Sequence, residues 1–108
     1  MDNVNEVKLF KLDLVKGEDF DLLNVGFNPA FIATNSEIVQ YVNQAKKDLF
    51  TGGRILKING ACSLVVLANL MPDLVYYYLV VAIFDPKLDG YVVSHSESPD
   101  FEVGQLLK

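Results

Sequence analysis

Cysteine, histidine and basic residues are scarce in this chain of 108 residues, and each shortage excludes a class of protein. Cys62 is the only cysteine, so no intramolecular disulfide can form. A lone thiol inside an apolar run is typical of a small buried hydrophobe. A catalytic thiol would need a base, and the single histidine, His95, lies far along the chain. One histidine and one cysteine also do not make a tetrahedral zinc site.

Positive charge is the next shortage: nine Lys and Arg residues stand against 14 Asp and Glu residues, which gives a net charge of −5. Binding to DNA or other long nucleic acids places many basic residues against phosphates, so we do not expect it here. A small anionic ligand needs only local positive potential, a helix N-terminus or a metal ion. That class of ligand therefore stays open.

Long hydrophobic runs are missing too. The longest, Leu74–Phe84, is too short for a membrane-spanning helix, and Met1–Asn5 is too polar and acidic to open a signal peptide. We therefore expect a cytoplasmic protein with no membrane partner. Hydrophobic residues still make up 51% of the chain, enough for one core, so residues 1–108 are expected to form a single domain.

The N-terminal half is predicted to hold a hairpin and one helix. Alternating apolar and polar residues, with a slip at Phe10-Lys11, indicate a strand over Glu6–Leu14, and Phe20–Phe27 is expected to be a second strand after a turn. Thr34-Asn35-Ser36-Glu37 fits a capping box. Apolar residues at helical spacing then continue to Leu49, and Gly52-Gly53 is expected to end the helix.

The C-terminal half is predicted to alternate between strand and helix. Arg54–Ile58 reads as a strand that Asn59-Gly60 breaks. The apolar segment after it predicts a buried helix, which Pro72 kinks or ends. The remaining segments are, in order, the buried helix over Ala61–Met71, a central strand over Tyr78–Phe84, a turn over Asp85–Gly90, and strands over Tyr91–His95 and Phe101–Leu106.

Together these elements predict an α/β fold: one small domain with a mixed sheet of five to six strands, two main helices, an N-terminal β-hairpin and a central β-α-β unit. The two strands of such a unit are parallel and adjacent or nearly so. Asn59-Gly60 and Asp85-Pro86-Lys87 would then lie at the same carboxyl edge of the sheet, where ligands of open α/β sheets bind.

Two clusters at that edge could carry chemistry. Asp85 could orient a hydroxyl, act as a base or hold a divalent cation, and Lys87 could neutralise a phosphate. The alternative is that Asp85 only caps a turn, since Asp-Pro commonly opens turns. The turn from Asn59-Gly60 to Ser63 enters a helix whose first amides could grip a phosphate. It is equally readable as a plain strand-to-helix turn.

Other polar side chains are candidates with ordinary alternatives. Asn69 and Asp73 share one face of the apolar helix, so they serve a ligand, a subunit interface or the helix end. His95 is a possible base or metal ligand, or a structural side chain at the end of a strand. The tyrosine run that begins at Tyr76 could stack on adenine rings, although at least one of the three is expected in the core.

The segment Gly53–Leu107 resembles the compact ring nucleases of type III CRISPR systems, which bind and cleave cyclic tetra-adenylate. The resemblance covers about half of the chain well, and the first fifty residues fit only in outline. The matching blocks are Asn59-Gly60, Ser63-Leu64, Asp85-Pro86-Lys87-Leu88, Tyr91-Val92-Val93, Ser96 and Val103-Gly104.

The resemblance implies a ferredoxin-like or cyclic-oligoadenylate-sensor-like fold, a homodimer and higher assemblies on the ligand. It also implies Mn²⁺-dependent nuclease activity, with cyclic oligoadenylate or short RNA as the ligand. The acid and base of the family's turn map onto Asp85 and Lys87, and Asp85 is the candidate metal ligand. Asn59, Gly60, Ser63, Asn69 and Ser96 are the candidate ligand-binding residues.

One position departs from the family pattern. A histidine is expected nine residues before Asp85, and this chain has Tyr76 there. Another falls near Ser96 or Glu97, where this chain has His95 beside them; a β-bulge could shift His95 into register. Three hypotheses follow: a ring nuclease that uses Asp85, Lys87, His95 and Tyr76, a binder that sequesters the messenger, and an interaction subunit without a nucleotide ligand.

Overall fold

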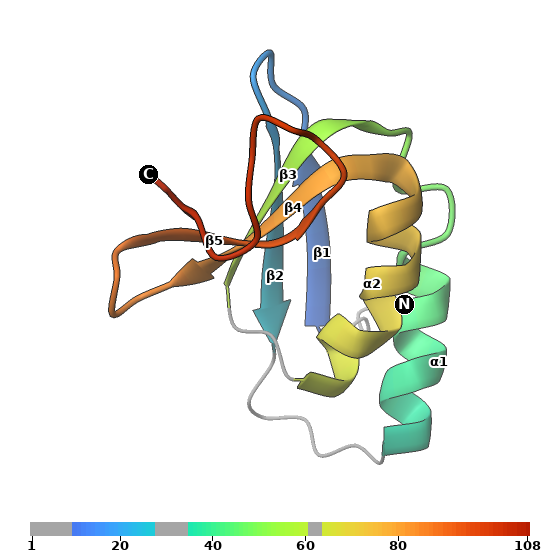
Figure 1. Cartoon of the computed structure of the whole chain (residues 1–108). Coiled ribbons are helices and arrows are strands. Elements are labelled where there is room, and N and C mark those ends of the chain that lie inside the picture. The colour runs from blue at the N-terminus through green and yellow to red at the C-terminus, as the bar shows by residue number, and fades with distance from the viewer. Residues whose placement is uncertain (1–9, 28–34, 61–63) are drawn as a thin grey trace.

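The computed structural model describes residues 10–27, 35–60 and 64–108, which fold into one sheet and two helices (Figure 1). In chain order the elements are β1 (Phe10–Val15), β2 (Asp21–Phe27), α1 (Asn35–Ala45), β3 (Gly53–Gly60), α2 (Leu64–Tyr77), β4 (Tyr78–Asp85), β5 (Gly90–Ser96) and β6 (Leu106–Leu107). The Glu6–Leu9 part of the first predicted strand, Thr34 of the capping box, Cys62 and Ser63 lie outside the described residues.

The six strands stand in the sheet in the order in which they occur along the chain. β2, β3 and β4 are parallel neighbours, whereas β1, β5 and β6 pair antiparallel to the strands beside them. The predicted α/β class, mixed sheet, N-terminal hairpin and central β-α-β unit are confirmed. The element order is β-β-α-β-α-β-β-β, which differs from the β-α-β-β-α-β order of ferredoxin-like folds.

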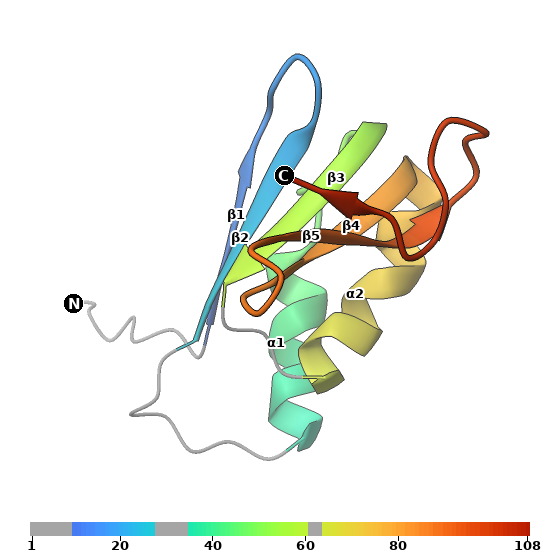
Figure 2. The same ribbon diagram turned by 60° about the vertical axis from the view of Figure 1, so that its left-hand side comes forward.

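Both helices cover the same face of the sheet, as Figures 1 and 2 show. Successive right-handed crossovers from β2 to β3 and from β3 to β4 place them side by side there. The main core lies between the helices and the sheet. Its fully buried members are Leu23, Val42, Leu56, Val66, Leu70, Leu74 and Val81. Each such side chain stabilises the fold by about 1.5–3 kcal/mol relative to exposure.

The helix-free face of the sheet carries a smaller apolar cluster of Ile55, Val80, Ala82 and Val93. The segment after β5 turns back over this cluster and inserts the ring of Phe101. Backbone hydrogen bonds hold the segment: Val93 N–H donates to the Gln105 carbonyl at 2.9 Å, and Gly104 N–H donates to the Val93 carbonyl at 2.8 Å. The final strand is therefore Leu106–Leu107 rather than the predicted Phe101–Leu106.

The ends of both helices differ from prediction. α1 ends at Ala45 rather than Leu49, because Leu49 and Phe50 leave the helix to pack into the core. Asp48 has a left-handed backbone (φ 59°) in the turn that follows the helix, and Gly52 (φ 98°) comes four residues later, just before β3. α2 continues through Pro72 to Tyr77. Because proline has no N–H, the carbonyl of Ala68 loses its helical hydrogen bond. Ala68 is exposed, so water can donate to that carbonyl instead.

Asn59-Gly60 does not break β3, contrary to prediction. The strand continues through both residues, and β2 pairs with them through Asn24 and Val25. Gly60 has a φ of +111°, and a Cβ atom there would overlap the Val25 carbonyl oxygen. Only glycine allows so close an approach of the two backbones, so Gly60 has a structural requirement of its own.

Candidate functional site

The carboxyl ends of β3 and β4 lie level with each other. Ile58 is the partner of Ile83, so Gly60 and Asp85, each two residues further on, reach the same edge of the sheet. This confirms the predicted placement of Asn59-Gly60 and Asp85-Pro86-Lys87 at one edge. Asn24 of β2, opposite Asn59, adds a polar side chain that the sequence did not single out. Its neighbours in the sequence carry no motif, and only the β2–β3 register shows it.

Asp85 ends β4 and caps the turn that follows. Its carboxylate oxygen Oδ1 accepts a hydrogen bond from the backbone N–H of Lys87 at 2.8 Å, and the Leu88 N–H donates to the Asp85 carbonyl at 3.2 Å. The side chain of Lys87 is exposed. Lys108 holds the same turn, since its Nζ donates to the carbonyls of Leu88 and Asp89 at 3.3 Å each. Asp85 therefore does fill the turn-capping role that the sequence allowed.

His95 does not lie beside this turn. A β-bulge is present in β5, as the sequence analysis allowed: His95 pairs with Val81 while Val93 pairs with Ala82, so Ser94 is the extra residue. Val81 precedes Asp85 by four residues of β4, which separates His95 from Asp85 by roughly 13 Å along the strand, at about 3.3 Å per residue. The bulge shifts the register but leaves His95 far from Asp85.

The immediate surroundings of His95 come from the end of β5. Its Nε2 atom is buried and lies 3.3 Å from Oε2 of Glu97, without hydrogen-bond geometry to any described group. The neighbouring Ser96 is structural in the described chain. Its hydroxyl donates to the carbonyls of Phe101 at 2.8 Å and Ser98 at 3.1 Å, and so anchors the returning segment.

Two further candidates lie on α2, away from the carboxyl edge. Tyr76 is 81% exposed in the last turn of the helix, and its ring packs edge-on against Tyr77. Since β4 begins at Tyr78, Tyr76 lies at the opposite edge of the sheet from Asp85. The Asn69 side chain donates to the Val65 carbonyl of its own helix at 2.8 Å. Ser63, the third candidate near this helix, lies outside the described residues.

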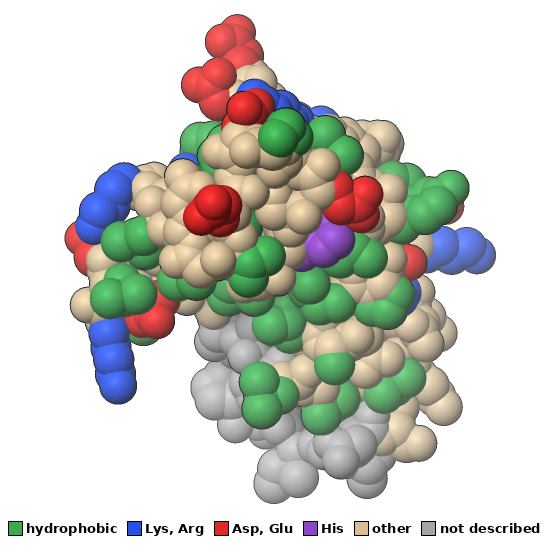
Figure 3. Space-filling view, viewed as in Figure 1, with side chains coloured by type: hydrophobic (Ala, Val, Ile, Leu, Met, Phe, Trp, Pro, Cys, Tyr) green, Lys and Arg blue, Asp and Glu red, His purple; other side chains and the backbone are tan. Residues whose placement is uncertain are grey.

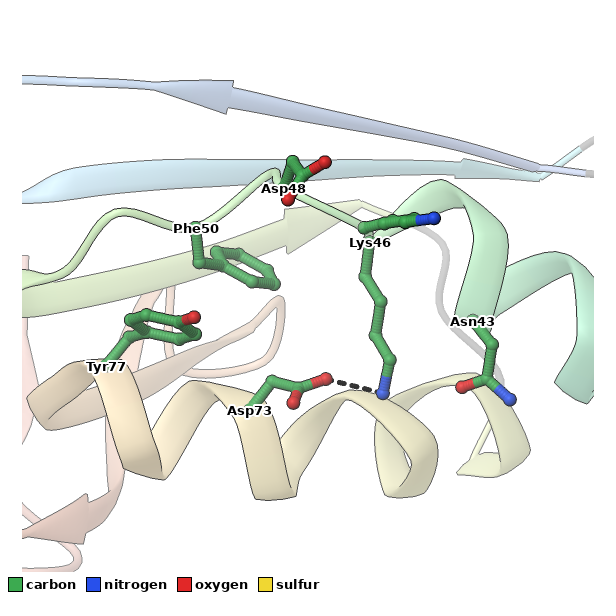
Figure 4. Close-up of a pocket in the computed structure, with 7 residues that line it drawn as sticks. Asn43, Lys46, Asp48, Phe50, Asp73 and Tyr77 are labelled. Atoms are coloured by element: carbon green, nitrogen blue, oxygen red, sulfur yellow. Dashed lines mark ion pairs between the residues drawn. The ribbon is translucent and has the colours of Figure 1, made fainter.

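A cavity of about 260 Å³ opens between the C-terminal parts of α1 and α2 (Figure 4). Lys46 crosses it: Nζ of Lys46 lies 2.5 Å from Oδ2 of Asp73 and donates to the Asn69 carbonyl at 3.0 Å. This confirms that Asn69 and Asp73 share one helix face. The cavity lies beside the C-termini of both helices, whose partial negative charge favours cations over anions. The Lys46 ammonium inside it is already paired with Asp73. The arrangement joins the helices rather than offering an anion site.

The most strongly perturbed carboxylate, Asp21, also lies away from the carboxyl edge, at the start of β2. Burial alone would raise its pKa, but hydrogen bonds from Lys16 Nζ (2.6 Å), the Tyr78 hydroxyl (2.8 Å) and the Gly17 N–H (3.2 Å) lower the pKa overall. Burial, together with the Asp21 charge, raises the pKa of Tyr78. Lys16 also donates to the Gly52 carbonyl at 2.9 Å. The network ties β2, β3 and β4 together at their starts.

Lys57 is the residue that sequence reasoning missed. It is only 9% exposed, in the middle of β3. Its Nζ lies 3.9 Å from the ring centroid of Phe20 and 5.1 Å from that of Tyr91, and it donates to the Lys108 carbonyl at 3.1 Å. The available signal was one charge inside the otherwise apolar run Ile55–Ile58.

A manganese site of the expected kind is not assembled by these residues. Across 10–27, 35–60 and 64–108, no three or more His, Cys, Asp or Glu side chains gather in a group that could hold a metal ion. Asp85 contributes one carboxylate, already engaged by the Lys87 N–H. We therefore derive no metal-dependent step. In the same described ranges, no helix has the length and apolarity needed to cross a bilayer.

The domain is thus a two-layer α/β unit with a polar carboxyl edge formed by β3, β4 and the β4–β5 turn. Residues 51–108, which contain that edge, match the model of the family described as CRISPR-associated protein (Cas_csx3). The match covers more than half of the chain, and the chain belongs to this CRISPR-associated family. No curated protein sequence matches the chain.

Proposed function

We propose that this chain binds cyclic oligoadenylate, above all cyclic tetra-adenylate, in type III CRISPR antiviral signalling. The observation that carries the proposal is that the region matched by the family model contains the polar carboxyl edge of the sheet. Asn59-Gly60 and Asp85–Lys87 both lie within residues 51–108 and at the carboxyl ends of adjacent parallel strands. That edge is where open α/β sheets bind ligands. A small ring has few phosphates, so a net charge of −5 does not oppose it.

Cleavage of the ring is the second candidate function, favoured by an acid and a base within one turn at Asp85 and Lys87. The ribose 2′-oxygen would attack the adjacent phosphorus, forming the O2′–P bond as the P–O5′ bond breaks. Asp85 would accept the 2′-hydroxyl proton, and the Lys87 ammonium would neutralise and protonate the leaving O5′. The products are a 2′,3′-cyclic phosphate and a 5′-hydroxyl, with no water consumed.

Binding without cleavage is supported by the positions of the other candidates. In the part of the chain that the structure describes, the backbone of His95 is level with Val81, roughly 13 Å from Asp85 along β4. Tyr76, which stands where the family has a histidine, is at the opposite edge. Binding is therefore the primary proposal, and turnover depends on Asp85 and Lys87 alone or on a second subunit.

A homodimer belongs to the same proposal. A ring with rotational symmetry suits a site made by identical subunits, with higher assembly on the ligand. The outward side of α2 supports this, because exposed apolar residues recur there every four positions: Leu64, Ala68, Pro72 and Tyr76. A contiguous stripe of exposed apolar residues is typical of an interaction surface, and this side of α2 is uncovered in the single chain.

The test is a thermal-shift series with cyclic tri-, tetra- and hexa-adenylate, followed by chromatography of labelled rings. A ligand at a hundred times its Kd stabilises the folded chain by about 2.7 kcal/mol, which is readily seen as a rise in Tm. Asp85→Ala should keep that rise and lose any linear product, and Asp13→Ala, an exposed carboxylate of β1, is the matched control. No shift with any ring would refute the proposal and leave an interaction subunit.

A further inference from the structure

Lys57 is buried in an unusual way for a lysine. It lies on the helix-free face of the sheet, because it pairs with Ala82 of the apolar cluster there, and its ammonium has one hydrogen-bond acceptor among the described residues, the main-chain oxygen of Lys108. No Asp or Glu side chain forms an ion pair with it among the described residues. An ammonium carries three N–H donors, and the two flanking rings compensate for only part of its lost hydration. An apolar residue would be more favourable here if Lys57 only filled space.

The surroundings of Lys57 combine aromatic rings with further positive charge. Phe20 is 38% exposed, and Tyr91 packs against Phe84 with ring centroids 5.3 Å apart. Lys108, which supplies the carbonyl to Lys57, sends its own Nζ to the turn between β4 and β5. Lys57 is therefore linked through Lys108 to the Asp85–Lys87 turn.

Positive charge also gathers on the surface near this part of the sheet. Basic side chains project beside the end of the β4–β5 hairpin in Figure 3, at its left-hand side, among acidic ones. Lys87 lies in the β4–β5 turn and Lys108 donates to it, whereas Lys57 is level with Ala82, roughly 10 Å from Asp85 along the sheet, so three of the chain's nine basic residues lie on this part of an acidic protein. Local positive potential beside aromatic faces is the combination that binds single-stranded nucleotides.

We propose that Lys57 is a phosphate-binding residue of the oligoadenylate site, with Phe20 and Tyr91 as the rings on which adjacent adenines stack. This inference rests on the proposed function and extends that site from the Asp85–Lys87 turn onto the open face of the sheet. A phosphodiester oxygen takes the place of the Lys108 carbonyl as the acceptor for Lys57. β6 has only two residues and lies at the sheet edge, so the pairing of this strand yields at little cost.

The test compares Lys57→Met with Lys47→Met by titration calorimetry at several salt concentrations. Both variants remove one positive charge, and Lys47 is an exposed residue beside the α1–α2 cavity at the opposite edge. Methionine keeps the unbranched stem and packs well against rings, so Lys57→Met should melt at or above the wild-type temperature. Cyclic and linear tetra-adenylate are the probes, since each carries a phosphodiester beside adenine.

We expect Lys57→Met to bind either probe roughly 10- to 100-fold more weakly, the loss of a hydrogen bond to a charged group. The slope of log K against log salt should fall by about 0.7, and Lys47→Met should bind as the wild type does. Should Lys57→Met fail to fold, Phe20→Leu is decisive, with a loss of about tenfold expected from the missing stacking face.

Two results would separate the failure of this inference from that of the proposed function. Wild-type protein that binds neither probe refutes both together. Wild-type protein that binds, with Lys57→Met binding within twofold of it, refutes the role of Lys57 alone. A loss in Lys47→Met in place of Lys57→Met would move the site to the helix cavity and equally refute the inference.

Discussion

Replacing Asp21 by asparagine should destabilise the fold more than any other isosteric change of a carboxylate in the described residues. Asp21 is 4% exposed and accepts three hydrogen bonds, from Lys16, Tyr78 and the Gly17 N–H. The neutral amide can still accept from one or two donors, but it loses the charge and presents an NH₂ group toward them. Hydrogen bonds to charged groups contribute about 1.5–3 kcal/mol each, and the half-exposed ammonium of Lys16 keeps water as a substitute.

The expected cost of Asp21→Asn is therefore about 2–3 kcal/mol, a large share of the 5–15 kcal/mol typical of a domain. Urea denaturation followed by circular dichroism measures it at pH 7. Asp13→Asn makes the same chemical change at an exposed position of β1 and should stay within about 0.5 kcal/mol of wild type. A cost below 0.5 kcal/mol for Asp21→Asn, relative to that control, would refute the assignment.

Acid titration of the same pair gives an independent test. The pKa of Asp21 is lower in the folded chain than its ordinary value, so its contribution is present above the unfolded pKa and is lost as the pH falls through the folded value. The stability gap between wild type and Asp21→Asn should therefore narrow as the pH falls from about 5 toward 2. A gap that stays constant over that range would contradict the charged role of Asp21.

Three further predictions concern the same framework. Gly60→Ala should cost at least about 3 kcal/mol in urea denaturation, because the new Cβ overlaps the Val25 carbonyl at a positive φ, and a wild-type midpoint would disprove the overlap. Lys46→Met should lower stability by about 1 kcal/mol in low salt through loss of the Asp73 pair, and by less in 1 M salt; no salt effect would contradict an ionic contact. Tyr78 has a raised pKa, so its contribution is present below its unfolded pKa of about 10 and is lost above it. Tyr78→Phe should accordingly flatten the alkaline limb of the stability curve, and an unchanged limb would exclude the link to Asp21.

Local periodicity was sufficient to predict most of the secondary structure. Alternation over Glu6–Leu14 identified a strand with one solvated face, because side chains in a strand point to opposite faces in turn, and the continuous apolar run Tyr78–Phe84 identified a strand buried on both faces. Element ends were less predictable. Pro72 was given too much weight, since an exposed helix position tolerates the lost hydrogen bond, and Asn59-Gly60 was taken as a break although β2 extends alongside it.

The carboxyl edge shows how the candidate site divides between sequence and tertiary structure. A β-α-β unit has one hand, so the chain order alone placed Gly60 and Asp85 at one edge. The position of His95 depended on the pairing of β4 with β5, where the sequence allowed a β-bulge but showed neither its place at Ser94 nor the distance of His95 from Asp85. Register is a property of two strands, and one strand's pattern does not contain it.

The surroundings of Lys57 could not be predicted from the sequence. Its sequence surroundings indicate only a charge within an apolar strand. The tertiary structure decides that Phe20 from before β2, Tyr91 from β5 and Lys108 from beyond β6 converge on its ammonium. The sequence by itself determined the α/β class, the two clusters at one edge and the resemblance to a CRISPR-associated family. Only the tertiary structure decided which side chains contact one another across the sheet. These contacts join segments more than thirty residues apart, and a local sequence pattern holds no information about them.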